Sequence, residues 1–285
     1  MKREEENWTE IISSERSLFD LRLGELWKYR DLILIFVKRD FIATYKQTIL
    51  GPLWHFIRPV ITTVLFTIVF GNIAKISTDG LPPFLFYLAG NVLWGYFSRC
   101  VMTTANTFQA NSNIFGKVYF PRMSVPISQV ISGLLQFGVQ FLLFLMVWAY
   151  YYFFTDSAIT FRPEALIFFP LMIVMMAFLG LGIGISVSAL TTKYRDLQVL
   201  VEFGVQLFMY MTPVIYPLSV LGEKYRSLAL LNPLTPLTEL FRYTFLGVGV
   251  FEMQYLIYSM IVVAVVFFIG LLVFNKVEQN FMDTI

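Results

Sequence analysis

An acidic and a basic residue at helical spacing form the clearest candidate for site chemistry in this sequence. Glu239 and Arg242 lie three residues apart, a spacing that lets them pair on one face of a helix. Prolines at 213, 217, 233 and 236 interrupt the apolar region around them. Such a region is typical of short half-helices, whose irregular backbone survives in a bilayer only when protein or a wet cavity covers it. The alternative is an ordinary loop with one surface helix.

The residues of known catalytic and nucleotide-binding motifs are missing from the sequence. It holds no G-x-x-x-x-G-K-[ST], H-E-x-x-H, C-x-x-C or G-x-S-x-G. Gly180, Gly182 and Gly184 have no lysine after them, so they favour close helix packing over phosphate binding. Cys100 and His55 are the single cysteine and histidine, too few for a disulfide framework or a clustered metal site. We therefore predict no catalytic residue, no metal and no cofactor in this chain.

The composition is that of a membrane protein. Of the 285 residues, 57% are hydrophobic and only 14% are charged, whereas soluble domains carry about 25% charged residues. The net charge of +2 gives no basic excess for binding nucleic acid. An ion pump would need acidic residues in the middle of the membrane. Glu202 lies at the edge of an apolar window, and we predict that it belongs to the cytoplasmic end of a helix instead.

Charge-free windows predict an all-α integral membrane fold with six transmembrane helices. A span needs about 20 mainly apolar residues, and the windows are 59–74, 80–98, 123–155, 165–192, 203–222 and 253–275. With both termini in the cytoplasm, most Lys and Arg residues fall in cytoplasmic segments, as the positive-inside rule requires. The short half-helices then lie on the outer side between spans five and six.

An amphipathic helix is predicted before the first span. Lys28, Arg39 and Lys46 fall on one face and apolar residues such as Ile33 and Phe36 on the other, which suits a helix lying in the cytoplasmic interface. A small soluble helical hairpin is the alternative. The Gly-Pro pair at 51–52 then bends the chain into the membrane. This divides the chain into a cytoplasmic segment (1–24), interface helix and bend (25–58), and six-span domain (59–285).

Two cytoplasmic loops are candidates for contact with a partner. The loop at 111–122 carries signals for a short helix that could dock into a partner's groove, although a plain turn is equally compatible. The second loop, 193–196, is very short and fits a topological anchor as well as a contact site.

Motifs in order along the chain resemble a known family. They are Tyr29-Arg30-Asp31-Leu32, Arg39-Asp40, Tyr45-Lys46-Gln47, Leu50-Gly51-Pro52-Leu53-Trp54, Pro59, Phe120-Pro121-Arg122, Tyr194-Arg195-Asp196, Thr212-Pro213-Val214-Ile215-Tyr216-Pro217, Asn232-Pro233 and Phe241-Arg242. Together they are similar to the membrane subunit, or permease, of type-2 ABC exporters for polysaccharides, O-antigens and teichoic acids. Residues 1–24 have no counterpart in this pattern.

The resemblance implies a transport subunit rather than an enzyme. Such permeases act as homodimers in the bacterial inner membrane, with two copies of a separate ATPase that binds ATP and Mg²⁺. They move a lipid-linked glycan out of the cytoplasm through a channel that the first and fifth spans line.

The resemblance also implies three groups of functional residues. ATPase coupling falls to Phe120, Pro121, Arg122, Tyr194, Arg195 and Asp196. The interface helix rests on the ATPases. Its basic stripe is a candidate for holding the cargo headgroup, with Arg39, Tyr45, Lys46 and Arg58 as the residues; anchoring of the helix to anionic membrane lipid is the alternative. The outer gate comprises Pro213, Tyr216, Pro217, Asn232, Pro233, Glu239 and Arg242.

Three alternatives differ in function. A related type-2 permease could export a drug or small lipid. A membrane-embedded glycosyl- or acyltransferase would need clustered acids or a histidine at the membrane surface, and an ion channel a repeated polar filter; the sequence has neither pattern.

Overall fold

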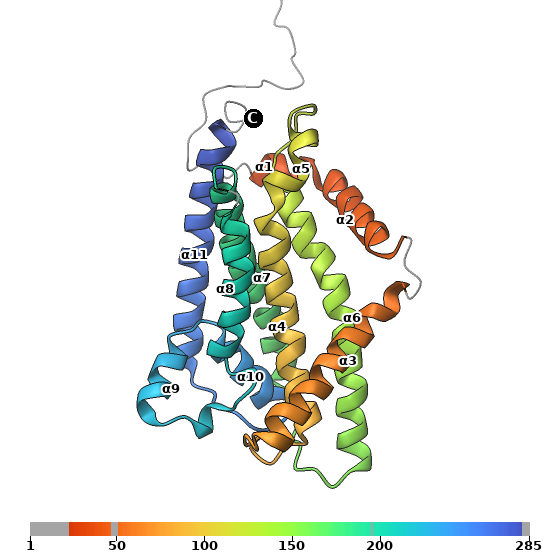
Figure 1. Cartoon of the computed structure of the whole chain (residues 1–285), viewed down its shortest axis with the longest axis vertical. Helices are drawn as coiled ribbons and strands as arrows, with labels where there is room; N and C mark the ends of the chain where they lie inside the picture. Colours follow the sequence, from red (N-terminus) through yellow and green to blue (C-terminus); the bar gives the residue numbers. More distant parts are fainter. Residues whose placement is uncertain (1–22, 47–50, 195, 281–285) are drawn as a thin grey trace, which may run out of the picture.

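The computed structural model describes residues 23–46, 51–194 and 196–280, and helices are the only regular secondary structure in those ranges (Figure 1). In chain order the elements are α1 (Leu23–Lys28), α2 (Arg30–Tyr45), η1 (Gly51–Leu53), α3 (Trp54–Phe66), the π-helical η2 (Thr67–Ile73), α4 (Pro83–Ala105), α5 (Thr107–Phe115), α6 (Ser124–Phe154), α7 (Ala165–Thr191), α8 (Leu197–Met211), η3 (Leu218–Val220), α9 (Glu223–Leu230), α10 (Thr235–Phe245) and α11 (Met253–Asn280). The all-α prediction is confirmed.

Helices α4, α6, α7 and α11 form the core of the bundle. Helix α7 packs against α4 and α11, and α4 packs in turn against α6. Most residues of α4 are buried, among them Tyr87, Tyr96 and Phe97. Large apolar side chains of α6, α7 and α11 remain exposed on their outward faces, as expected where lipid rather than water surrounds the bundle.

The three glycines of α7 make its close contacts possible. A Cβ at Gly180 would lie 2.6 Å from the Cβ of Cys100 in α4, and one at Gly182 would lie 2.7 Å from the Cα of Phe267 in α11. A Cβ at Gly184 would overlap Thr104 of α4. The glycines thus allow the backbones of three helices to approach one another, which confirms the packing role predicted for them.

Four helical segments are long and apolar enough to cross a membrane: Trp54–Ile73, Ser124–Phe154, Ala165–Thr191 and Met253–Glu278. They correspond to the first, third, fourth and sixth predicted spans. Helix α4 has 23 residues, enough for about 34 Å, but it carries polar residues along its length. Helix α8 has 15 residues, about 22 Å, which is short of a full crossing. The count of six spans therefore stays a prediction.

The fifth predicted window, 203–222, has the wrong bounds. Helix α8 begins earlier, at Leu197, and ends at Met211, because Thr212 takes an extended conformation and Pro213 follows it. A proline disfavours helical conformation in the residue before it. The end of the window belongs to a turn and to η3.

The predicted interface helix is two helices, α1 and α2, separated by a turn at Tyr29. Helix α2 runs obliquely beside the bundle and packs on α6 (Figure 1). Ile33 and Phe36 are buried on its bundle side, whereas Lys38 is exposed. Leu34 and Ile35 are also exposed, so apolar side chains extend beyond the predicted face. Gly51, at φ +48°, takes the left-handed conformation that glycine adopts most readily.

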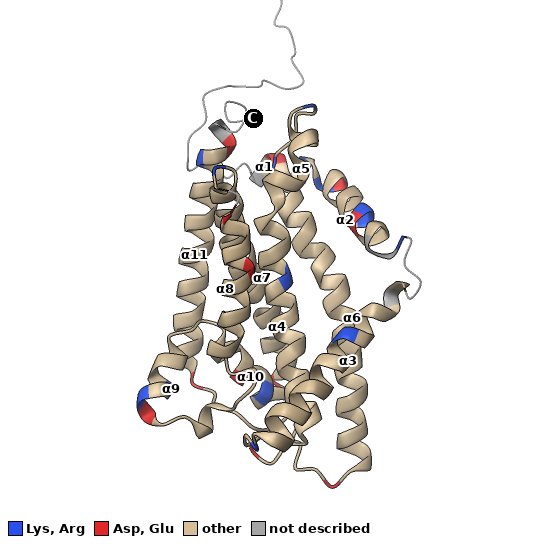
Figure 2. Ribbon diagram, in the orientation of Figure 1, with Lys and Arg blue, Asp and Glu red and all other residues tan. Residues whose placement is uncertain are grey.

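Short helices gather at one end of the bundle and the C-terminal part of α11 at the other (Figure 1). We call the first the α10 end, which holds α9 and α10, and the second the α5 end, where α1 and α5 also lie. Figure 2 shows charged residues mainly towards these two ends, with few along the long helices. This distribution is the one expected for a bundle embedded in a bilayer.

The glycine contacts of α7 predict a stability difference between two glycine substitutions. Gly182→Val forces a side chain against the α11 backbone and should cost about 1–3 kcal/mol, as overpacking does. Gly138→Val in α6 is the control, since a Cβ there meets nothing within 4 Å. Thermal unfolding of the detergent-purified chain should show a lower midpoint for Gly182→Val only. Equal midpoints would contradict the packing role.

Candidate functional site

The turn after α8 is held by a polar side chain from the loop before α10. The amide of Asn232 donates to the hydroxyl oxygen of Thr212 at 2.8 Å, and the Thr212 hydroxyl donates to the Phe208 carbonyl at 2.9 Å. Asn232 also accepts a hydrogen bond from the Leu234 backbone N–H at 3.0 Å. The predicted gate residue Asn232 therefore ties the end of α8 to the start of α10.

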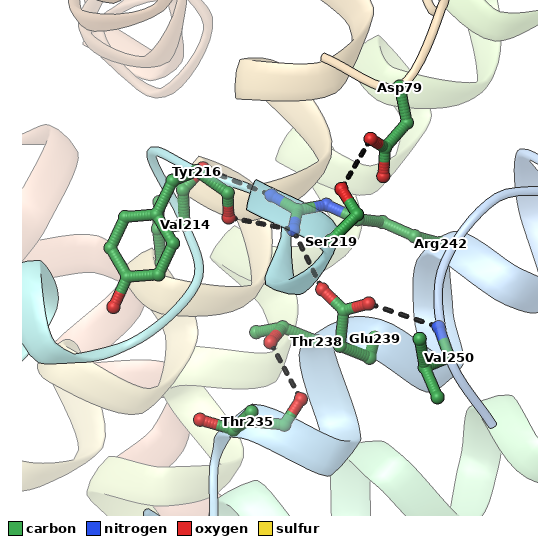
Figure 3. Close-up of polar contacts among 9 residues, drawn as sticks. All are labelled: Asp79, Val214, Tyr216, Ser219, Thr235, Thr238, Glu239, Arg242 and Val250. Carbon is green, nitrogen blue, oxygen red and sulfur yellow. Dashed lines mark hydrogen bonds and ion pairs between the residues drawn. The ribbon is translucent and has the colours of Figure 1, made fainter. Parts of the chain in front are cut away.

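Arg242 of α10 is the centre of the polar contacts in this region (Figure 3). Its guanidinium donates to Glu239 Oε1 at 3.1 Å, and both side chains are 2% exposed. It also donates to the carbonyl of Val214 at 3.1 Å and lies 3.5 Å from the carbonyl of Tyr216. The predicted Glu239–Arg242 pair is confirmed, and it reaches the segment that follows α8.

Two neighbours complete this arrangement. The other carboxylate oxygen of Glu239 accepts from the Val250 backbone N–H at 3.1 Å. The guanidinium carbon of Arg242 lies 3.8 Å from the centre of the Phe86 ring in α4, a cation–π contact that gains strength where water is excluded. One buried pair thus joins α10, α4, the segment 212–217 and the loop before α11.

Glycines allow the backbones around the pair to come close. A Cβ at Gly90 of α4 would lie 2.9 Å from the Val214 carbonyl oxygen. Gly249 takes a φ of +108°, and a Cβ there would lie 2.9 Å from the carbonyl oxygen of Glu239. The segment 212–217 is therefore held between α4 and α10. Pro213 and Pro217 are buried within it.

A second contact between loops lies beside the pair. Ser219 donates to a carboxylate oxygen of Asp79 at 2.6 Å, which links the loop after η2 to η3 (Figure 3). Sequence reasoning missed both residues, because 140 positions separate them and neither belongs to a local pattern. The whole arrangement has no exposed acid, base or nucleophile at its centre, so it suits a latch between elements rather than a catalytic site.

At the α5 end, Phe120 is buried where three elements meet. Its ring lies 5.6 Å from that of Phe36 in α2 and 5.7 Å from that of Phe115 in α5. The guanidinium of Arg122 donates to the Glu278 carbonyl in α11 at 2.7 Å and faces the Phe115 ring at 5.7 Å. Pro121 lies between them and is half-buried. These predicted coupling residues connect the loop to α2 and α11.

The exposed part of this loop is its tip, Gly116 to Tyr119. Val118 is 60% exposed and Tyr119 41%, and Lys117 is exposed beside them. The predicted coupling residues Phe120, Pro121 and Arg122 directly follow this tip. We define Gly116, Lys117, Val118 and Tyr119 as the α5 tip.

The other predicted residues are spread along the chain. Tyr194 and Asp196 are exposed between α7 and α8, whereas Arg195 lies outside the described residues. Arg39 pairs with Asp40 at 2.9 Å and faces the Phe36 ring. Tyr45 is the last residue of α2, and Lys46 after it is exposed.

Arg58 is exposed in α3 and lies 5.9 Å from the Trp54 ring. Pro213 and Pro217 of the outer gate are buried near the Arg242 pair, whereas Pro233 and Tyr216 are half-buried. Within the described residues no group of His, Cys, Asp and Glu side chains is arranged to hold a metal ion.

Helix α8 presents a stripe that mixes polar and apolar residues. Val199, Glu202, Phe203, Gln206 and Tyr210 are all exposed and follow helical spacing. Glu202, predicted near a helix end, lies in the second turn of α8, five residues after the helix begins at Leu197. Because no residue of this helix is buried, one whole face is open to a partner or to solvent.

The model of the ABC-2 type transporter family matches residues 31–246, most of the bundle just described. The chain belongs to the ABC-2 type transporter family. It is 26% identical to an O-antigen export system permease protein, RfbA, of Klebsiella pneumoniae, over 89% of this chain and 94% of the relative. An RfbA of Myxococcus xanthus is 29% identical over 75% and 79% of the two chains.

A third ABC-2 relative is the polysialic acid transport protein KpsM of Escherichia coli. It is 23% identical over 86% of this chain and 93% of the relative. The names of all three relatives describe export or transport of a polysaccharide, and this ABC-2 chain is a transport permease of the same kind.

We call the Glu239–Arg242 pair, with its contacts to Val214 and Phe86, the Arg242 latch. It predicts that a single substitution lowers stability more than a double one. Arg242→Met leaves the Glu239 carboxylate buried without its cation and should cost about 3–5 kcal/mol. The double variant Arg242→Met/Glu239→Gln removes both charges while the amide oxygen still accepts from Val250, so it should be more stable than the single variant. Chemical unfolding in detergent micelles measures both.

Arg226→Met is the matched control. Arg226 pairs with Glu252 at 3.8 Å, and both side chains are 40% exposed, so its loss should cost less than about 1 kcal/mol. The latch would be contradicted if Arg242→Met were no more damaging than Arg226→Met.

Proposed function

We propose that this chain is the membrane-spanning subunit of an ATP-driven exporter for lipid-linked polysaccharide of the O-antigen, capsule or teichoic-acid type. The main support for this proposal is the match to an O-antigen export permease and a polysialic acid transport protein over nearly the full length of both chains. The lack of a nucleotide-binding motif supports an external source of energy. The cargo then moves from the cytoplasmic side across the bacterial inner membrane.

The energy comes from two copies of a separate ATPase subunit that binds ATP and Mg²⁺. The ATPase docks on this chain at the α5 tip together with Tyr194 and Asp196, all of which are exposed. Motion of the tip passes through the buried Phe120 ring to α2 and through the Arg122 hydrogen bond to α11. Both chain termini then lie in the cytoplasm, in keeping with the excess of Lys and Arg in the segments assigned there.

The cargo path runs along α8 in a homodimer. A charged side chain that faces hydrocarbon within a membrane span is costly, so the exposed Glu202 and Gln206 favour a polar space beside this helix. Apolar side chains such as Ile61 and Leu65 are exposed on α3, and a second copy of the chain would cover such surface. The first and fifth predicted spans then line one channel.

The α10 end forms the outer gate of this channel. The Arg242 latch holds the segment 212–217, which directly continues α8, against α4 and α10. Any movement of α8 on the α10 side must therefore carry this segment with it or break the Val214 contact. This supports a gate whose closed state the buried pair stabilises.

The proposed cargo can be tested in a strain that lacks the gene for this chain. Loss of surface glycan, with its lipid-linked precursor accumulating inside, and recovery by the cloned gene are the expected results. Immunoblotting of surface glycan and drug-efflux assays are run side by side. Normal glycan display with impaired drug efflux would instead identify a drug or small-lipid permease.

Docking through the α5 tip predicts the effect of a charge placed there. Tyr119→Asp should lower export and the stimulation of ATP hydrolysis by about tenfold, because it adds a carboxylate to a partly apolar contact. Tyr225→Asp, on the exposed face of α9 at the other end of the bundle, is the control. Export and ATPase rates of the reconstituted complex measure the effect. Equal rates in the two variants would remove the docking assignment.

A further inference from the structure

One face of α4 is polar although the rest of the helix is buried. Between Leu85 and Ala105, the residues that are not fully buried lie at spacings of three and four, and therefore on one side of the helix. They are Asn91, Gly95, Ser98, Arg99, Met102 and Thr103. We call this the α4 polar face. A half-exposed face of this composition does not suit contact with lipid tails.

Helix α6 places a second polar stripe beside this face. Its members follow the same helical spacing and are Gln129, Ser132, Gly133, Gln136 and Gln140. A Cβ at Gly95 would lie 3.2 Å from the side-chain oxygen of Gln140, and one at Gly133 would lie 3.8 Å from Cδ of Arg99. The amide groups of α6 therefore border the α4 polar face.

Helix α3 borders the face from its other side and adds positive charge. The Asn91 amide donates to the Thr63 hydroxyl oxygen in α3 at 3.1 Å. Arg58 of α3 and Arg99 of α4 both lie within electrostatic range of the His55 imidazole. Helices α3, α4 and α6 contain two arginines and no acidic residue. Positive charge this far inside an apolar bundle favours an anionic ligand.

We propose that the α4 polar face binds the phosphate-bearing headgroup of the glycan cargo, an inference that rests on the proposed function. Arg99 and Arg58 hold the phosphate, because arginine pairs with phosphate oxygens through two N–H groups at once. The half-exposed side chains of Asn91 and Gln140 bind sugar hydroxyls.

The length of the face separates this ligand from an ordinary phospholipid. Asn91 and Thr103 are twelve residues apart, about 18 Å along the helix. A lipid phosphate needs only the basic end near Arg99, and it leaves the amide groups further along α4 and α6 unused. A phosphate followed by one or more sugars occupies both parts.

Binding of synthetic headgroups to the permease–ATPase complex in nanodiscs tests the site. The probes are dodecyl diphosphate carrying N-acetylglucosamine, dodecyl diphosphate without sugar, and phosphatidylglycerol as competitor. Arg99→Gln should raise the Kd of both diphosphate probes about tenfold, the value of a charged hydrogen bond. Gln140→Leu should raise the Kd of the sugar-bearing probe alone, about threefold.

Control variants keep the result interpretable. Arg99→Lys retains charge and should bind with an intermediate Kd, which shows that loss in Arg99→Gln is not misfolding. Arg226→Gln removes a distant exposed arginine and should bind as wild type. Wild-type binding by Arg99→Gln would overturn the site. So would competition by phosphatidylglycerol as strong as that by the sugar-bearing probe, since the face would then be a lipid contact.

Surface glycan display separates the site from the proposed function. If the wild-type chain exports glycan but Arg99→Gln binds the probes as tightly as wild type, the proposed site is wrong and the proposed function still holds. If Arg99→Gln weakens binding but deletion of the gene leaves glycan display intact, the proposed function is wrong. The α4 polar face then remains a phosphoglycan-binding surface.

Discussion

Hydrocarbon as a solvent sets the constraint on which the whole arrangement depends, because it cannot satisfy a charge or a hydrogen bond. Each polar group in the bundle must therefore pair inside the protein or face a polar space. Arg242 and Glu239 follow the first course, with backbone partners around both side chains. We propose that the α4 polar face and Glu202 of α8 follow the second.

The two ends of the bundle use buried contacts of different kinds. At the α10 end, a charged pair fixes the segment after α8 and joins four parts of the chain. At the α5 end, aromatic rings around Phe120 and one guanidinium link α2, α5 and α11. Aromatic contacts can shift without leaving a charge unpaired, whereas the Arg242 pair can break only at a large cost. In the proposed exporter, this difference suits an input that moves readily and a gate that opens only when driven.

Local patterns in the sequence predicted features that depend on neighbouring residues. The spacing of Glu239 and Arg242 predicted their ion pair, and Gly180, Gly182 and Gly184 predicted close packing of α7. The partners of these residues could not be predicted, because Val214, Phe86 and Phe267 reach them through the tertiary fold. The bounds of the fifth window were wrong because a run of apolar residues does not indicate where Thr212, before Pro213, takes an extended conformation and ends the helix. The α4 polar face was missed because a search for charge-free windows placed Arg99 outside the second span.

The central claim is that this ABC-2 chain conducts a glycan only when a separate ATPase drives it. Its most direct test is uptake of labelled lipid-linked glycan into vesicles that contain the chain alone, the ATPase alone, or both. The account predicts ATP-dependent uptake with both proteins and none with either by itself. Uptake or ATP hydrolysis by the purified chain without the ATPase would contradict it.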